Sequence, residues 1–326
     1  MSIYYKYAPD GSKIVVLFYV DDCVYWYTAE AIGKWFVDTF RNRFHVNFFI
    51  CAHWFISIKI SQMKDRSISV NQARYATSIV AKYLDTAIFK VSTKFYNTIF
   101  PDNMIFTKED TSTSDEQVEK LTKEFNIHYR ACIGSLIYLF STRLDLSFAV
   151  KTLAKFSENP GKVLFEVLVH LLRYISDNKT LGFKCYADLN NAPVTDLLRQ
   201  ASIKTDNHLM YFSDSSWKYF PVTGRSTGAY ILFYQGGPID HVTHVPVPVA
   251  QLSAESEYNA ACTAGMDLAH FTILIHEFLN KDTDIITEEA PLIVFDSKST
   301  ICMANNGKDT KHTRHIARRM HLVRNG

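Results

Sequence analysis

The stretch IVVLFYVDDCVYWY, residues 14–27, sets two adjacent carboxylates, Asp21 and Asp22, between two short apolar segments. Apolar runs of this length bounded by turn residues are typical of buried strands, and Asp is favoured in turns but not in cores. The stretch therefore predicts a hairpin with both acids at its tip. Two carboxylates held so close repel each other unless a cation lies between them, and Mg²⁺ and Mn²⁺ prefer such oxygen ligands. An ordinary solvent-facing turn is the alternative interpretation.

The composition is that of a folded protein with room for two domains. The chain has 326 residues, 47% of them hydrophobic, and a formal net charge of +2. A nucleic-acid surface must therefore come from a local cluster of basic residues rather than from the overall charge. The strongest cluster is residues 308–324, which contain six Lys or Arg, three His and one acid, Asp309.

Cysteine usage and hydropathy bear on the cellular compartment. The six cysteines are scattered without CxxC spacing, and the chain begins without the apolar core of a secretion signal. Reduced thiols in the cytosol or nucleus are therefore expected. No apolar run approaches the ~18 residues that a membrane-spanning helix needs. We expect a protein that is neither secreted nor embedded in a membrane.

Residues 1–187 mix helical and extended patterns. Apolar side chains recur at helical spacing in several segments and alternate or cluster as in strands in others. A polar stretch, residues 188–208, contains Asn190, Asn191 and Pro193 and is interpreted as a domain linker. The predicted helices are 28–44, 71–84, 127–141, 145–157 and 163–176, and the predicted strands after the hairpin are 46–60 and 67–70, with a polar loop at 101–116.

The pattern changes after residue 208. Three antiparallel strands, a helix, another strand and more helix form the predicted order, which is that of the ribonuclease H fold. The predicted strands are 209–213, 227–235, 239–249 and 291–295, and the predicted helices are 253–279 and the segments after 297 and 311.

Three acids lie at the ends or faces of these predicted elements. Asp214 follows the apolar residues 209–212, Asp296 ends the last strand, and Glu257 lies on the long helix just before Tyr258. Three such carboxylates could converge on one Mg²⁺ site. Each acid taken alone is more often a helix cap or a turn residue.

Eight motifs, in order along nearly the whole chain, resemble the Pol polyprotein of copia-type LTR retrotransposons. The resemblance implies an α+β or α/β architecture, with a partial reverse-transcriptase palm and a helical connection at 1–187. An RNase H-like mixed-sheet domain, truncated at its C-terminal end, is expected at 209–326. The motifs are FYVDD (18–22), YRACIGSLIYL (129–139), TRLDLSFAV (142–150), NPGK (159–162), SDSSW (213–217), GRSTGAYILFYQGGPI (224–239), LSAESEY (252–258) and DSKST (296–300).

The resemblance also implies activities, ligands and partners. It assigns Asp21 and Asp22 to the metal site of an RNA-directed DNA polymerase, an activity of the full-length parent. It assigns Asp214, Glu257 and Asp296 to a Mg²⁺- or Mn²⁺-dependent nuclease site that cuts RNA in RNA:DNA hybrids. The expected partners are such hybrids or other nucleic acid, and other parts of the polyprotein. The expected location is the cytoplasm, within a virus-like particle, or the nucleus.

Two further assignments concern single positions. Glu257 is preferred to Glu255 because the ligand precedes the Tyr in the family pattern, and the two side chains lie about 200° apart around a helix. The basic cluster is interpreted as a phosphate-binding surface. A solvated helix face is its alternative. The residues assigned to nucleic-acid binding are Lys308, Lys311, Arg314, Arg318 and Arg319.

Several features depart from the family pattern. Residues 240–248, DHVTHVPVP, contain no Lys or Arg, and Ala317 stands where the family has Asp. The family's fourth nuclease acid and its third polymerase acid fall outside residues 1–326. We therefore expect no primer extension by this chain alone, and hybrid cleavage that is weak or absent with Mg²⁺ and better with Mn²⁺.

Two other interpretations stay open. One is a decayed remnant that binds nucleic acid without catalysis. The other is a cellular protein that uses an RNase H-like scaffold for protein contacts.

Overall fold

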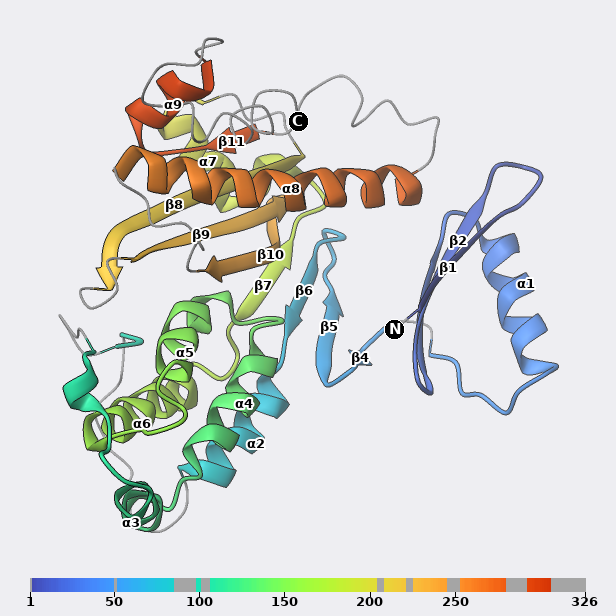
Figure 1. Cartoon of the computed structure of the whole chain (residues 1–326). Coiled ribbons are helices and arrows are strands. Elements are labelled where there is room, and N and C mark those ends of the chain that lie inside the picture. Colours follow the sequence, from blue (N-terminus) through green and yellow to red (C-terminus); the bar gives the residue numbers. More distant parts are fainter. Residues whose placement is uncertain are drawn as a thin grey trace.

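The computed structural model describes residues 2–49, 52–84, 98–100, 106–203, 208–220, 225–244, 253–279 and 292–305. These residues form three β-sheets with helices packed around them, which is the mixed architecture expected from the sequence (Figure 1). Among the described helices, none is both long and apolar enough to span a membrane.

An antiparallel sheet with a helix on one face forms the N-terminal part of the chain. Ile14 and Val16 of the central strand face Ile32 and Phe36 of the helix, because alternate residues of a strand share a side, and the four side chains form a small core. The outer strand β1 is exposed along its whole length. The elements are β1 (Ser2–Tyr7), β2 (Lys13–Tyr19), β3 (Asp22–Tyr27) and α1 (Glu30–Arg41).

The predicted hairpin of residues 14–27 is confirmed. Tyr19 of β2 pairs with Asp22 of β3, so Val20 and Asp21 form the turn between the strands. Val20 has a φ of 54°. This left-handed conformation suits a two-residue hairpin turn but is strained for a β-branched side chain.

The largest hydrophobic core lies among the helices of the middle of the chain. Leu164, Leu168, Leu171 and Ile175 follow one face of α6 and are fully buried. The predicted helices of this region are confirmed, whereas α3 was not expected from the sequence, although Ser114 caps it. The helices are α2 (Ala73–Tyr83), α3 (Asp115–Phe125), α4 (Tyr129–Leu139), α5 (Ser147–Ala154) and α6 (Lys162–Asp177).

A second sheet lies beside these helices in the order β4-β5-β6-β7. The predicted strand 46–60 is wrong at its start, because residues 46–49 lie outside any strand. The last strand of this sheet comes from far along the chain, after α6, and was not predicted. The strands are β4 (Trp54–Phe55), β5 (Ile58–Gln62), β6 (Ile68–Asn71) and β7 (Gly182–Cys185).

The third sheet has the order β10-β9-β8-β11, in which β11 runs parallel to β8 and the other pairs are antiparallel. Tyr211 and Leu232 of its central strands are buried against Ala264 of the long helix α8. The predicted element order is thus confirmed up to α9, while the helix expected after 311 lies outside the described residues. The elements are β8 (Leu209–Phe220), β9 (Arg225–Tyr234), β10 (Gly237–His244), α8 (Ser253–Leu279), β11 (Leu292–Val294) and α9 (Lys298–Asn305).

A short helix, α7 (Pro193–Gln200), covers another part of this sheet. Its Val194 and Leu198 are buried in one cluster with Met210 of β8. The segment interpreted as a linker, residues 188–208, therefore contains a helix that packs on the sheet.

Contacts near β7 and β10 join the third sheet to the second sheet and to helix α5. The Tyr186 amide donates a hydrogen bond to the Gln235 carbonyl at 3.0 Å, and Lys151 of α5 donates one to the Thr243 carbonyl of β10 at 2.9 Å. The backbones approach closely at Gly237, where an added Cβ would lie 2.5 Å from the sulfur of Cys185. In Figure 1, β7 runs from the lower sheet toward the upper one.

Candidate metal centre and nucleic-acid groove

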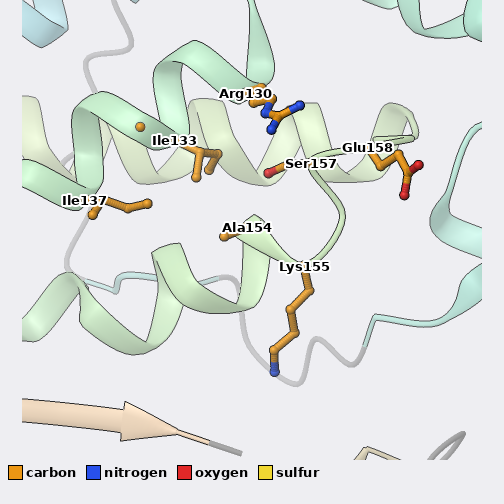
Figure 2. Close-up of a pocket in the computed structure, with 8 residues that line it drawn as sticks. Arg130, Ile133, Ile137, Ala154, Lys155, Ser157 and Glu158 are labelled. Carbon is orange, nitrogen blue, oxygen red and sulfur yellow. The ribbon is translucent and has the colours of Figure 1, made fainter.

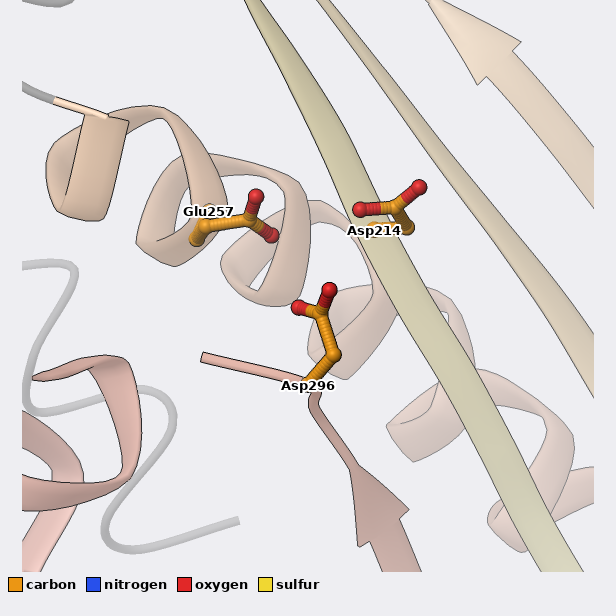
Figure 3. A group of neighbouring side chains, drawn as sticks. All are labelled: Asp214, Glu257 and Asp296. Atoms are coloured by element: carbon orange, nitrogen blue, oxygen red, sulfur yellow. The ribbon is translucent and has the colours of Figure 1, made fainter. Parts of the chain in front are cut away.

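The structure brings three of the predicted site residues together on the third sheet, where β11 ends beside β8 (Figure 3). Asp214 lies on β8, Glu257 near the start of α8, and Asp296 just after β11. Carboxylate oxygens of the three residues all lie within 4.8 Å of one another. One detail of the expectation is wrong, because β8 continues to Phe220 and Asp214 lies within the strand rather than at its end.

Glu257 has a different environment from its two partners. Asp214 and Asp296 are exposed, whereas Glu257 is partly buried between α8 and β8. Its Oε2 atom is buried and accepts no hydrogen bond from the described residues. An acceptor left this way costs free energy unless another group satisfies it.

The charge state of Glu257 follows from these surroundings. The pKa of Glu257 is raised to about 7, first by burial and also by the negative charges of Asp214 and Asp296. Hydrogen bonds from the Ser215 hydroxyl and backbone amide act in the opposite direction. Both causes of the rise would be offset by a cation held among the three carboxylates.

The donor set fits a hard divalent cation. All three groups offer carboxylate oxygens, which Mg²⁺ and Mn²⁺ prefer. The buried Oε2 of Glu257 has no hydrogen-bond partner among the described residues, and such an ion would supply one. Glu255, the acid set aside in the sequence, is 7% exposed and does not belong to the group.

The other predicted site residues lie elsewhere. Asp21 and Asp22 remain at the tip of the β2–β3 hairpin, and within the described part of the chain no third acid joins them in a metal-binding group. The residues assigned to phosphate binding lie outside the described residues, namely Lys308, Lys311, Arg314, Arg318 and Arg319.

A groove on the helical region was not predicted from the sequence. It is a hollow of about 600 Å³ between α4 and the turn after α5 (Figure 2). Apolar side chains line it together with Arg130, Gly134, Lys155, Ser157 and Glu158. A second hollow of about 470 Å³ adjoins it, because Arg130 and Ser157 line both. Arg130 and Lys155 give this groove two exposed cations and Glu158 gives it one exposed acid, so its lining carries a net positive charge that suits an anionic ligand.

Gly134 is the residue from which this groove could have been predicted in the sequence. It lies in the middle of α4, where Gly costs about 1 kcal/mol relative to Ala. An added Cβ would meet no atom within 4 Å, so packing within the described residues does not require a glycine there. A glycine on an exposed helix face is consistent with close approach of a ligand.

The motif TRLDLSFAV has a structural explanation. Arg143 is 1% exposed, its Nη2 lies 2.7 Å from Asp145 Oδ2, and its Nη1 donates to the Asn178 carbonyl at 2.8 Å. The Tyr174 hydroxyl donates to the same Asp145 oxygen at 3.0 Å. These bonds fix the corner between α4 and α5 onto the end of α6.

Comparisons with known proteins agree with this architecture. The chain is 23% identical to a retrovirus-related Pol polyprotein from transposon TNT 1-94 of Nicotiana tabacum, over 99% of the chain and 22% of that relative. It is 24% identical to one from transposon RE2 of Arabidopsis thaliana, over 96% of the chain and 19% of the relative. An uncharacterized mitochondrial protein of Arabidopsis thaliana is 23% identical over 78% of the chain and 92% of its own length.

The chain is thus a relative of the retrovirus-related Pol polyproteins of transposons, as the motifs predicted. It spans about a fifth of the length of these Pol relatives, because the matched segments make up 22%, 19% and 19% of their chains. No family model matches the chain. No solved structure matches it either.

Proposed function

We propose that this chain carries the ribonuclease H centre of a retrotransposon Pol polyprotein and cleaves the RNA strand of RNA:DNA hybrids. The observation that carries the proposal is the convergence of three carboxylates, from β8, α8 and the end of β11, within 4.8 Å. The sheet order, with one parallel strand beside three antiparallel ones, supports it. The similarity to Pol polyproteins supports the substrate class.

Asp214, Glu257 and Asp296 would hold Mg²⁺ or Mn²⁺ in this centre. Such ions activate a water and stabilise the negative charge that develops on the scissile phosphate. The exposed Asp214 and Asp296 would present oxygens on the side open to substrate, while Glu257 completes the site from the helix. Glu257 is the most buried of the three acids, so it would determine where the negative charge of the site is placed.

The groove between α4 and α5 is proposed to contact the hybrid backbone. Arg130 and Lys155 would bind phosphates, and Gly134 would admit the sugar–phosphate chain close to the helix. The basic cluster of residues 308–324 is a second proposed phosphate-binding surface.

The β2–β3 hairpin is proposed to belong to an RNA-directed DNA polymerase centre. Asp21 and Asp22 would be two of its metal ligands. This activity is proposed for the longer Pol protein, in which other parts of the polyprotein would act as partners.

Cleavage of labelled RNA annealed to DNA tests the nuclease proposal. We expect cleavage with Mn²⁺, weaker cleavage with Mg²⁺, and none after Asp296→Asn or Asp214→Asn, because each change removes a charged ligand but keeps the side-chain shape. Asp38→Asn, the same exchange at an exposed position of α1, should leave cleavage unchanged. Activity that survives the double variant Asp214→Asn/Asp296→Asn would refute the site.

A second candidate function is nucleic-acid binding without catalysis. The groove favours it, because Arg130 and Lys155 are far along the chain from the three acids and would bind phosphates without them. Hybrid binding with no cleavage in either metal ion would select this candidate.

A further inference from the structure

The groove between α4 and the turn after α5 has an apolar floor that the proposed phosphate contacts do not use. Ile133 and Ile137 of α4 and Ala154 of α5 line its larger hollow (Figure 2). Arg130 and Lys155 line the same hollow with their charged side chains. Ile137 is 48% exposed, so the floor is accessible to a ligand.

The backbone of a duplex would not cover this floor. In a paired strand the bases are stacked inside the duplex, and the protein contacts sugars and phosphates along the outside. Phosphates would bind Arg130 and Lys155 but leave the isoleucine side chains in contact with water. A planar and largely apolar group has to enter the hollow to remove that surface from water. An unpaired base is such a group, because it can be splayed out from a strand whose phosphates remain attached to it.

The space in the groove matches a ligand of this size. The larger hollow has about 600 Å³ and the adjoining one about 470 Å³. Pockets that hold small ligands have roughly 300–1,000 Å³. At Gly134 the wall is open, since an added Cβ would meet no atom within 4 Å. A base therefore has room to lie against this face of α4.

The charges along both hollows suit a continuous anionic strand. His128 and Arg130 line the smaller hollow, and no acid is among the described residues that line it. Arg130 and Ser157 line both hollows, so a strand with one base in the larger hollow could place its next phosphate beside Arg130. Loss of hydration lowers the pKa of Lys155 to about 8, and a bound phosphate would offset that loss.

We propose that the groove binds an unpaired nucleotide of a single strand that extends from a hybrid. Its base would lie on the floor of Ile133, Ile137 and Ala154, and its phosphates would contact Arg130 and Lys155. The inference deepens the proposed function and rests on it, because it takes the groove as part of the nucleic-acid surface. It does not require the metal centre to be active.

Binding of fluorescent hybrids to the full chain, without divalent ions, tests this inference. A blunt RNA:DNA hybrid is compared with the same hybrid carrying a single-stranded extension of roughly four to eight nucleotides, of RNA in one set and of DNA in another. We expect an extension of at least one kind to tighten binding about 5-fold or more, the scale on which one sheltered base contributes to single-strand binding. The kind that gives the larger gain identifies the strand that the groove takes.

Two variants change the hollow without removing its cations. Gly134→Leu fills the open space beside α4, and Ile137→Ser removes the exposed apolar part of the floor. Each should reduce the ratio of the two affinities toward one. Ile273→Ser, the same exchange at an isoleucine that is 60% exposed on α8, is the control and should leave the ratio unchanged. Thermal unfolding of each variant separates loss of binding from loss of fold.

The outcomes distinguish this inference from the nuclease proposal. Equal affinities for blunt and extended hybrids would overturn the inference, and so would a gain that survives both Gly134→Leu and Ile137→Ser. Neither result bears on the three acids, which are tested by cleavage with Mn²⁺. No cleavage by the parent chain would overturn the nuclease proposal and leave the affinity ratio readable. No binding of any hybrid would overturn the groove as a nucleic-acid surface, and the inference with it.

Discussion

Glu257 links the protonation of the candidate centre to the stability of the chain. Its pKa is about 7 in the folded protein, mainly because of burial, against 4.5 for an unperturbed Glu. The folded state therefore holds a proton that the unfolded state releases between these values. Without divalent ions, we expect the free energy of unfolding to fall as the pH rises from 4.5 to 7, and this fall to be absent in Glu257→Gln.

Mg²⁺ should have the opposite pH dependence. The ion competes with the proton for Glu257, so its stabilising effect should be larger at pH 7 than at pH 5. Urea unfolding at both pH values, with and without Mg²⁺, measures this difference. An equal Mg²⁺ effect in Glu257→Gln would contradict the assignment.

Arg143 gives a prediction about stability rather than activity. Its guanidinium is almost fully buried, so Arg143→Ala would leave the partly exposed Asp145 carboxylate and the Asn178 carbonyl without their donor. We expect a loss of about 1–3 kcal/mol in the free energy of unfolding. Arg130→Ala, at an exposed site on α4, should change it by less than about 0.5 kcal/mol.

At the level of single residues, the sequence predicted the acids but not their supports. Asp214 and Asp296 follow apolar strand segments, and the resemblance to Pol polyproteins assigned all three acids and selected Glu257 rather than Glu255. Ser215 has no such signal, since its hydrogen bond to Ser256 depends on α8 lying against β8. The buried state of Arg143 was equally hidden, because an Arg in a polar tripeptide is normally exposed.

Among the elements, the β9–β10 turn offers a sharp test of backbone packing. An added Cβ at Gly237 would lie 2.5 Å from the Cys185 sulfur and 2.7 Å from the Lys184 carbonyl oxygen. Gly237→Ala should therefore lower the thermal unfolding temperature, because β7 or β10 must move. Gly134→Ala is the counterpart with open space around it and should raise the free energy of unfolding by up to about 1 kcal/mol.

Elements with strong periodicity were predictable, and short ones were not. The long α8 and the strands of the third sheet follow clear apolar patterns, and their order agrees with the structure. β7 has four residues and pairs with β6, more than a hundred positions earlier. α7 lies in a polar stretch whose apolar residues, Val194 and Leu198, are too few to suggest burial without the sheet that covers them.

On the scale of the whole molecule, the groove and the acids should contribute differently to hybrid binding. Replacing Arg130 or Lys155 with Ala should weaken binding to hybrids of any sequence and reduce the salt slope by about one for each residue. Loss of hydration lowers the pKa of Lys155 to about 8. Hybrid binding should therefore be measured at pH 7, where Lys155 is still mostly protonated. Lys34→Ala, an exposed position on α1, is the control.

An unchanged salt slope in both groove variants would assign binding to another surface. Asp296→Asn should not weaken binding in the absence of divalent ions, because it removes negative charge. The groove variants thus test affinity for the hybrid, and Asp296→Asn tests cleavage.

The motif order predicted the arrangement along the chain but not how its parts touch. Contacts such as Lys151 to the Thr243 carbonyl depend on packing between segments that lie far apart in sequence. No local pattern encodes them.

Helix α7 has a consequence for how genes related to this one could exchange segments by recombination. A recombination breakpoint near residue 208 would look harmless in sequence, since it falls in a polar stretch that was interpreted as a linker between two domains. It would nevertheless separate β8 from the helix that covers Met210, and the transplanted module would carry an uncovered apolar surface. A cassette that functions in a new host protein would have to bring residues 189–203 with it.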